Sequence, residues 1–273
     1  VGAMMNTSTT APVWTHRTTG VRLARWAGLL ALVALFVFCW QVMTVDTMWV
    51  FVTDAPRQAM DIGSRMLPPK LSYLDDLIVP IWDTLNIATL GTLMGIVFAI
   101  PVAFLAASNT TPSVLFVRPI ALFIIVASRS INSLIWALLL VSIIGPGLLA
   151  GIVAIALRSI GFVAKLLYEA IEETDISQIE AVRATGASRL QGLDYAIVPQ
   201  VLPAFFGIAV FRWDINIRES TILGLVGAGG IGLQLQESLN VLAWPQVTMI
   251  FIVILATVVI SEWVSAKVRH AII

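Results

Sequence analysis

Three arginines inside long apolar segments are the residues of this sequence best placed to take part in chemistry. Arg129, Arg158 and Arg212 each lie about ten to twelve residues into such a segment, close to mid-depth for a membrane helix that rises about 1.5 Å per residue. One charge at that depth costs about 2.5–3.5 kcal/mol, and three cost roughly 8–10 kcal/mol unless they face water, an anion or carboxylates. A guanidinium group donates two parallel hydrogen bonds to a tetrahedral oxyanion. The pattern therefore predicts a polar pathway for an anion such as phosphate or phosphonate.

Two further polar residues are expected on this pathway. Arg218 lies about one and a half turns after the last of the three arginines, and we expect it to share an outward chamber with Glu219. Asn132, about one turn after the first, offers an amide to the passage or equally makes a helix–helix hydrogen bond. The alternative is that the arginines are structural and pair with Asp214, Glu219 or helix carbonyls. We favour a pathway because three cations on three helices have few obvious internal counter-ions. The predicted substrate pathway comprises Arg129, Asn132, Arg158, Arg212 and Arg218.

The sequence does not contain the residues of a metal or disulfide site. Cys39 is the only cysteine, and His16 and His270 lie near opposite ends, so no cluster has the ligand spacing that a metal needs. Basic and acidic residues number 16 each, which argues against a nucleic-acid partner. We expect no catalytic residue, no metal and no cofactor in the chain itself.

The composition places these residues in a membrane. Hydrophobic residues make up 59% of the 273 residues and charged residues 12%, with a mean hydropathy of +0.94. A membrane-spanning helix needs about 20 mostly apolar residues, and six segments meet this requirement. The sequence thus predicts an all-α membrane protein with spans near 24–44, 79–107, 114–143, 148–168, 200–224 and 246–266.

Four regions follow from these spans. Residues 1–20 form an N-terminal tail, 21–44 the first transmembrane helix, 45–78 an outer interfacial segment and 79–268 the membrane core. We expect the first helix to be retained rather than removed as a signal peptide, because its apolar run is long and lacks a small-residue cleavage site.

The positions of lysine and arginine predict the orientation, since short cytoplasmic flanks are enriched in them. One side collects the cations, which are Arg17, Arg22, Arg25, Arg118, Lys165, Arg183, Arg189, Lys267 and Arg269. Both termini and the loop 169–199 are then cytoplasmic, while 45–78, the turn 145–147 and 226–245 face outward.

The loop 169–199 is polar and carries helix signals. Ser177 and Glu180 fit a capping box that would start a short helix, and Gly186 suits a left-handed exit from it. A second short helix from about Ala187 would place Leu190, Leu193 and Ile197 on one face, and Pro199 fits the first turn of the next span. The pattern predicts a helix–glycine–helix elbow.

The elbow resembles the EAA signature of ABC-importer permeases in Glu180, Ala181, Gly186 and Pro199. That resemblance implies a MetI-like permease core and a coupling helix, with Arg183 among its contacts, that docks in a groove of a cytoplasmic ATPase. This sequence departs from the signature at three positions, namely Val182, Ala196 and Val198.

Three more stretches resemble those of the phosphonate-importer permeases, and the similarity runs over roughly residues 78–268. They are 184–187 with 220–232, and 129–132 on the third span. The resemblance implies a bacterial inner-membrane permease for phosphonate, phosphite or phosphate. Its implied partners are a second copy of the chain, two ABC ATPase subunits that bind ATP and Mg, and an extracytoplasmic substrate-binding protein. Methionine-importer permeases share much of the glycine-rich run, so import of another small solute such as methionine is the alternative.

The glycine-rich run itself could be mistaken for a phosphate-binding loop. A dinucleotide fingerprint requires a preceding strand in a βαβ unit, whereas a membrane helix precedes this run. We expect glycines that permit a tight turn and close helix approach in an outward element at 224–235. The predicted gate or hinge residues are Gly227, Gly229, Gly230 and Gly232.

Two functions of other classes are weaker. An ion-coupled secondary transporter predicts an inverted repeat and acidic ion sites near the membrane midplane, and the sequence shows no clear repeat. An intramembrane enzyme would pair Ser128 or Ser130 with Lys165. The serines lie near mid-depth and the lysine near the inner face, so this pair is disfavoured.

Overall fold

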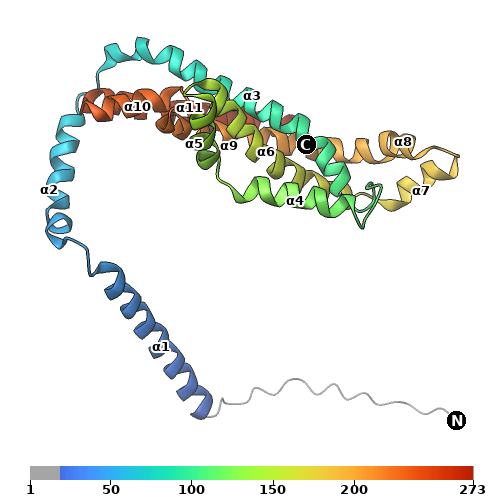
Figure 1. The fold of residues 1–273 in the computed structure, drawn as a ribbon, viewed down its shortest axis with the longest axis horizontal. Coiled ribbons are helices and arrows are strands. Elements are labelled where there is room, and N and C mark those ends of the chain that lie inside the picture. The colour runs from blue at the N-terminus through green and yellow to red at the C-terminus, as the bar shows by residue number, and fades with distance from the viewer. Residues whose placement is uncertain (1–18, 273) are drawn as a thin grey trace. The chain divides into compact units, whose positions relative to one another are not determined.

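The computed structural model describes residues 19–272 of the chain (Figure 1). The predicted tail therefore lies almost entirely outside the described residues, together with His16 and Arg17. Between Thr19 and Ile272 the elements are helices and no strand is present, which confirms the all-α prediction. The chain divides after Met60 into two compact units.

Eleven α-helices and three short helical turns make up the described chain. Their bounds are α1 Thr19–Thr44, α2 Trp49–Met66, η1 Leu71–Tyr73, α3 Leu74–Ala106, α4 Val117–Ser130, α5 Ser133–Ile144, α6 Leu148–Glu172, α7 Ile176–Ala184, α8 Arg189–Gly192, η2 Leu193–Ile197, α9 Val198–Leu223, η3 Gly224–Val226, α10 Ile231–Asn240 and α11 Trp244–Ile272. Five stretches of helix are long and apolar enough to span a membrane, or six if α4 and α5 together form one span.

The first unit contains α1 and most of α2. No residue of α1 is buried, so its apolar surface is free to face lipid. In α2 the polar side chains pair locally, as in the 2.9 Å hydrogen bond that Gln58 Nε2 donates to Asp54 Oδ2 one turn earlier. Helix α3 begins at Leu74, inside the predicted interfacial segment 45–78, and the position of this segment at the membrane surface stays a prediction.

The second unit is built around α3 and α6, which pack closely through small residues. A Cβ on Gly91 would lie 2.7 Å from Cγ2 of Ile155, and a Cβ on Gly95 would lie 2.5 Å from Cβ of Ser159. Glycines at such contacts let helix backbones approach, which is how membrane helices gain packing energy without a hydrophobic driving force. This close contact brings α9 and α4 against the same central pair.

The predicted third span, 114–143, is wrong as a continuous helix. It breaks into α4 and α5, which meet at 87°. Ile131 adopts an extended conformation, and the Asn132 side chain accepts a hydrogen bond from the backbone N–H of Leu134 at 3.2 Å. An asparagine at this position caps a new helix, so local capping overrides the apolar continuity of the segment.

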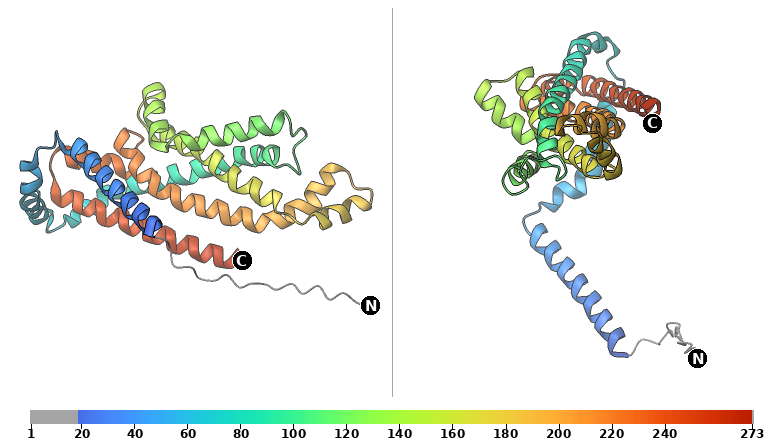
Figure 2. Two further views of the ribbon diagram at one scale, coloured as in Figure 1. Left: turned by 90° about the horizontal axis from the view of Figure 1, so that it is seen from below. Right: turned by 90° about the vertical axis from the view of Figure 1, so that its right-hand side faces the viewer.

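The two ends of the second unit carry different connections (Figure 2). At one end the turn 145–147 meets the glycine-rich element through a 3.0 Å hydrogen bond from Gly147 N to Gly227 O. At the other, the α7–α8 elbow projects, and Ser108 N donates to Glu172 Oε1 at 2.7 Å. The turn 145–147 and the glycine-rich element, both predicted to face outward, lie at the end opposite the elbow. Which end faces the cytoplasm stays a prediction.

Candidate functional site

Arg212 is the most deeply placed of the predicted pathway arginines. It lies in the middle of α9, and its side chain is 1% exposed. Its Nε donates to Ser159 Oγ on α6 at 3.0 Å, and its guanidinium lies 5.0 Å from the ring centroid of Phe162. Its Nη2 lies 3.5 Å from Oε2 of Glu219 on the same helix. The cation is thus removed from lipid by one carboxylate, one hydroxyl and one aromatic face.

Arg158 reaches the same carboxylate from α6. Its Nη1 lies 3.0 Å from Glu219 Oε1, with its side chain 30% exposed. It also donates to Asn132 Oδ1 at 3.2 Å and to Ser133 Oγ at 3.3 Å. Arg158 therefore connects the α4–α5 break to the carboxylate on α9.

Glu219 contacts both Arg158 and Arg212, and these three residues form one charged cluster. This contact corrects our expectation about counter-ions. We expected few internal counter-ions, but Glu219 contacts both guanidinium groups. One carboxylate against two cations still leaves an excess positive charge. Within the described chain, Arg212 Nη2 and Glu219 Oε2 are buried without a hydrogen-bond partner. These two atoms are the partners in the 3.5 Å ion pair between Arg212 and Glu219, so their charges compensate each other although they do not form a well-aligned hydrogen bond.

Buried neutral groups surround the cluster, and sequence reasoning missed them. Asn216 is fully buried and donates through Nδ2 to Thr92 Oγ1 at 2.7 Å and to Ser159 Oγ at 3.0 Å. Asn216 lies four residues after Arg212, so both occupy one face of α9. That spacing was the available signal.

Arg218 does not join Arg158 and Arg212. It pairs with Asp214, one turn earlier on α9, and Asp214 also accepts a 3.0 Å hydrogen bond from Ser261 Oγ on α11. This pair therefore faces α11, whereas Glu219 faces α6. The contacts do not support the predicted chamber shared by Arg218 and Glu219, because the two side chains leave α9 in different directions.

Arg129 also lies apart from the cluster. It is exposed near the end of α4 and lines a cavity of about 330 Å³ with Ser130, Lys165 and Tyr168. The Lys165 ammonium donates to Tyr168 Oη at 2.7 Å and pairs with Glu169. The break after α4 separates Arg129 from Asn132, which we expected one turn away on a continuous helix. Lys165 is thus a second cation beside Arg129 that our pathway did not include.

The elbow begins with a different cap from the one predicted. Asp175, not Ser177, caps α7 and accepts from the backbone N–H of Ser177 at 2.9 Å. The hydroxyl and N–H of Ser177 donate to this carboxylate and hold the pKa of Asp175 below its usual range. Ser188 and Gln191 form the capping box, and they do so at the start of α8. An aspartate two residues earlier displaced the serine because it satisfies the same orphan N–H groups.

The turn of the elbow matches the prediction at Gly186, which has φ +84°. Leu193 and Ile197 pack on the core cluster with Ile179 and Val201. Leu190 does not, since it is 77% exposed. The buried face of this part of the elbow begins only at Gly192. The predicted apolar face is therefore wrong at Leu190.

The predicted coupling residues lie on this elbow and at the start of α9, and Arg183 among them faces the loop after α3. Glu180, Ala181, Arg183 and Gly186 are exposed, and Pro199 is exposed in the first turn of α9. Leu190 and Tyr195 add exposed apolar surface, 77% and 70% exposed respectively. A polar and apolar surface mounted on a buried apolar base is suited to docking.

The glycine-rich element is a tight turn packed against α3 and α6. Gly227, Gly229 and Gly230 have positive φ angles of 86°, 82° and 73°, which other L-residues rarely adopt. A Cβ on Gly230 would lie 2.6 Å from Thr84 Oγ1, the same oxygen that accepts from Ile231 N at 2.8 Å. Gly232 is helical, and a Cβ there would lie 2.8 Å from the Cα of Gly224. The glycines thus serve turn geometry and close packing, while their role as a gate stays a prediction.

Comparisons with known proteins agree with this architecture. Residues 91–269 match the family described as binding-protein-dependent transport system inner membrane component. The chain is 40% identical to the phosphite transport system permease protein PtxC of Stutzerimonas stutzeri, over 85% of this chain and 83% of that protein. It is 38% identical to the phosphate-import permease protein PhnE of Mycolicibacterium smegmatis, over 88% of this chain and 44% of that protein. In fold it is similar to a chain of the inward-facing MetNI methionine ABC transporter, with a TM-score of 0.65, 22% identity, and coverage of 75% and 99% of the two chains.

Proposed function

The chain belongs to the family of binding-protein-dependent transport system inner membrane components, and from this premise we propose that it is the permease of an ATP-driven importer for a phosphorus oxyanion. Phosphite, phosphonate and phosphate are the substrate class. The chain is a multi-pass inner-membrane protein. The proposal draws on the transport functions of its relatives and on the arginine cluster of this chain.

One observation carries the proposal for the substrate: Arg158 and Arg212 share a single carboxylate, Glu219. The excess positive charge would attract an anion, and Arg158 is partly exposed. Guanidinium groups fit the oxygens of phosphorus oxyanions in bidentate geometry. Binding must stay weak, since a transport pathway has to release what it binds. Methionine import, the alternative, is supported by similarity of fold and by more distant sequence relatives.

The role of each predicted pathway residue follows from its place. Arg158 would contact the anion, and Asn132 would orient the Arg158 guanidinium. Arg212 would supply a fixed positive charge behind Arg158. Arg129, beside Lys165, would line a separate part of the route. Arg218 is the weakest member, because Asp214 already pairs with it.

An uptake assay with the reconstituted complex tests this proposal. We expect Arg158→Gln to lower uptake of phosphite, phosphonate and phosphate about 10- to 100-fold, because it removes a charge-assisted hydrogen bond of about 1.5–3 kcal/mol. The complex should still assemble. Arg57→Gln is the matched control, since Arg57 is exposed on α2. Uptake by Arg158→Gln at the control rate with ordinary selectivity would make the arginine structural.

We further propose that the elbow docks on a separate ATPase subunit. The partners are a second copy of this chain, two ABC ATPase subunits carrying ATP and Mg, and an extracytoplasmic binding protein. Both termini and the elbow would then be cytoplasmic, and ATP-driven closure of the ATPases would move the elbows and the attached spans. Glu180→Lys reverses an exposed charge on α7 and should leave ATP hydrolysis without coupled uptake. Unchanged coupled turnover would remove the docking proposal.

We also propose that the glycine-rich element works as a gate at the outer mouth. Its packing against Thr84 and Leu148 places it where α3 and α6 meet the turn after α5. A disulfide cross-link between Gly151→Cys on α6 and Ala228→Cys in the element should block uptake while leaving ATPase docking intact, because a Cβ on Gly151 would lie 3.3 Å from the Cβ of Ala228. Uptake at the normal rate in the cross-linked protein would make the element purely structural.

A further inference from the structure

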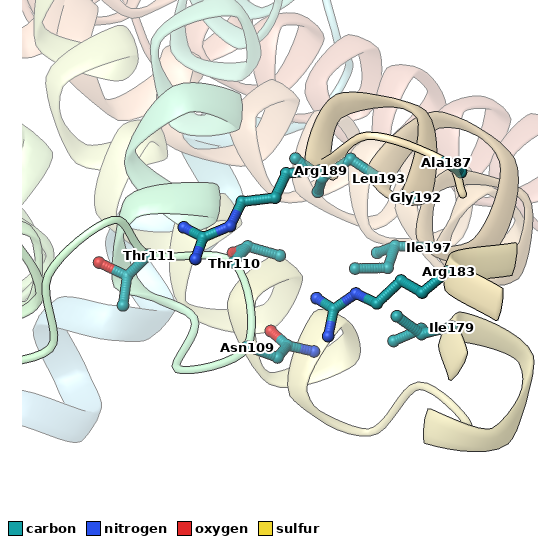
Figure 3. A pocket seen from close by; sticks show the side chains of 10 residues that line it. All are labelled: Asn109, Thr110, Thr111, Ile179, Arg183, Ala187, Arg189, Gly192, Leu193 and Ile197. Carbon is teal, nitrogen blue, oxygen red and sulfur yellow. The ribbon is translucent and has the colours of Figure 1, made fainter. Parts of the chain in front are cut away.

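A cavity of about 510 Å³ lies between the elbow and the loop after α3 (Figure 3). The elbow contributes an apolar floor and the loop a polar wall. The floor is held in place because Ile179 and Ile197 are buried in the core cluster. The lining residues are Asn109, Thr110, Thr111, Ile179, Arg183, Ala187, Arg189, Gly192, Leu193 and Ile197.

Two arginines give this cavity its charge. Figure 3 shows the Arg189 side chain extending toward Thr110 and Thr111 and the Arg183 side chain extending toward Asn109. The ion pairs found between residues 19 and 272 include neither Arg183 nor Arg189.

Two carboxylates at the edge of the elbow have partners of their own. Glu172 pairs with Arg118 at 3.0 Å and accepts from Ser108 N at 2.7 Å. Asp175 accepts from the hydroxyl and N–H of Ser177. Each of these acids is therefore engaged at the edge of the elbow, and neither neutralises the cavity.

The opposite wall is fixed by hydrogen bonds that leave acceptor oxygens available for water or a ligand hydrogen. Asn109 Nδ2 donates to Ile171 O at 2.7 Å, and Thr110 Oγ1 donates to Phe104 O at 2.6 Å. The donors available to a ligand are consequently the guanidinium N–H groups, which bind tetrahedral anions in bidentate geometry.

We infer that this cavity binds a phosphate-type anion, held between Arg183 and Arg189. The anion would be a free phosphorus oxyanion or the phosphate of a lipid headgroup, which share the chemistry recognised here. A bound anion would connect α7 and α8 to the loop 107–113 and restrain the elbow. The inference stands on the cavity and its charges, and it does not rest on the proposed transport substrate.

Local hydrogen exchange on the full chain in nanodiscs tests the site. One arm adds inorganic phosphate to phosphatidylcholine nanodiscs, and the other replaces part of the lipid with phosphatidylglycerol and adds no phosphate. We expect slower exchange in peptides covering 107–113 and 183–193 in at least one arm. Peptides covering 155–162 and 212–220 report the membrane cluster separately.

Charge-removing variants decide whether the arginines bind the anion. We expect Arg189→Gln to raise the ligand concentration needed for protection about tenfold. The double variant, Arg183→Gln with Arg189→Gln, should show no protection. Arg57→Gln is the matched control on α2 and should change nothing. Protection by phosphate identifies a free anion, and protection by phosphatidylglycerol identifies a headgroup. No protection in either arm, or equal protection in the double variant, would overturn the inference, while transport selectivity would remain a separate result.

Discussion

Replacing Glu219 with glutamine should expose how much the protein depends on its shared carboxylate. The change removes the negative charge that lies 3.0 Å from Arg158 and 3.5 Å from Arg212 while keeping nearly the same shape. At an effective dielectric constant of about 20, each contact is worth about 5 kcal/mol before desolvation is subtracted. Breaking a buried pair costs about 3–5 kcal/mol net, because the other charge is left uncompensated. Arg212, only 1% exposed, is the charge that would bear this cost.

The loss should appear as a lower melting temperature of the full chain in detergent. With about 2–4 °C per kcal/mol for a chain of this size class, we expect Glu219→Gln to lower the Tm by roughly 6–20 °C. Adding Arg212→Met should recover much of the loss, since it removes the stranded buried cation. Glu237→Gln is the matched control, because Glu237 is exposed on α10.

Two results would contradict this reasoning. If Glu219→Gln melts within about 2 °C of the control, the carboxylate does not neutralise Arg212. The second result concerns additivity. If Arg212→Met lowers the stability of Glu219→Gln as much as it lowers that of the wild-type protein, the two side chains do not interact.

Other predictions concern the elbow and the glycine-rich element. Gly186→Val should reduce coupled uptake without preventing membrane insertion, because φ is +84° there and left-handed backbone costs about 1–2 kcal/mol; Gly207→Ala, on a helical glycine with open space around it, should behave as wild type. Gly230→Ala should lower the Tm, because it combines a φ of +73° with a Cβ placed 2.6 Å from a side-chain oxygen, and an unchanged Tm would remove the packing argument. The Asp175 carboxylate should cap α7 at neutral pH, and this contribution should be lost as pH falls through its depressed pKa. Hydrogen exchange in 176–184 should then lose this acid dependence in Asp175→Asn.

Local signals in the sequence were enough for the elbow turn but not for its caps. Gly186 was predicted from its position after a polar helix and has the expected positive φ. Asp175 and Ser177 both suit a helix start, and only the structure shows which one accepts the hydrogen bond. Competing caps within two residues differ little in intrinsic preference.

The broken third span shows a second limit. Apolar continuity over 114–143 favoured one helix, yet Asn132 starts a new one at 87° to the first. Asn132 was singled out as a pathway residue and was not considered as a cap. An asparagine among apolar residues can serve either role, and in the structure it does both by capping α5 and contacting Arg158.

The sequence by itself determined the membrane class, the helical fold, the family and the presence of costly cations at mid-depth. These follow from composition, segment length and short motifs, which are local properties of the chain. Only the tertiary structure decided which cations share a counter-ion. Glu219 meets Arg158 across two helices 61 residues apart in sequence, Arg218 turns toward α11, and Arg129 lies beside Lys165. Such pairings depend on how packed helices are rotated and how closely they approach. Glycines at the α3–α6 contact permit a close approach, but the resulting distances depend on two helices and cannot be predicted from either segment alone.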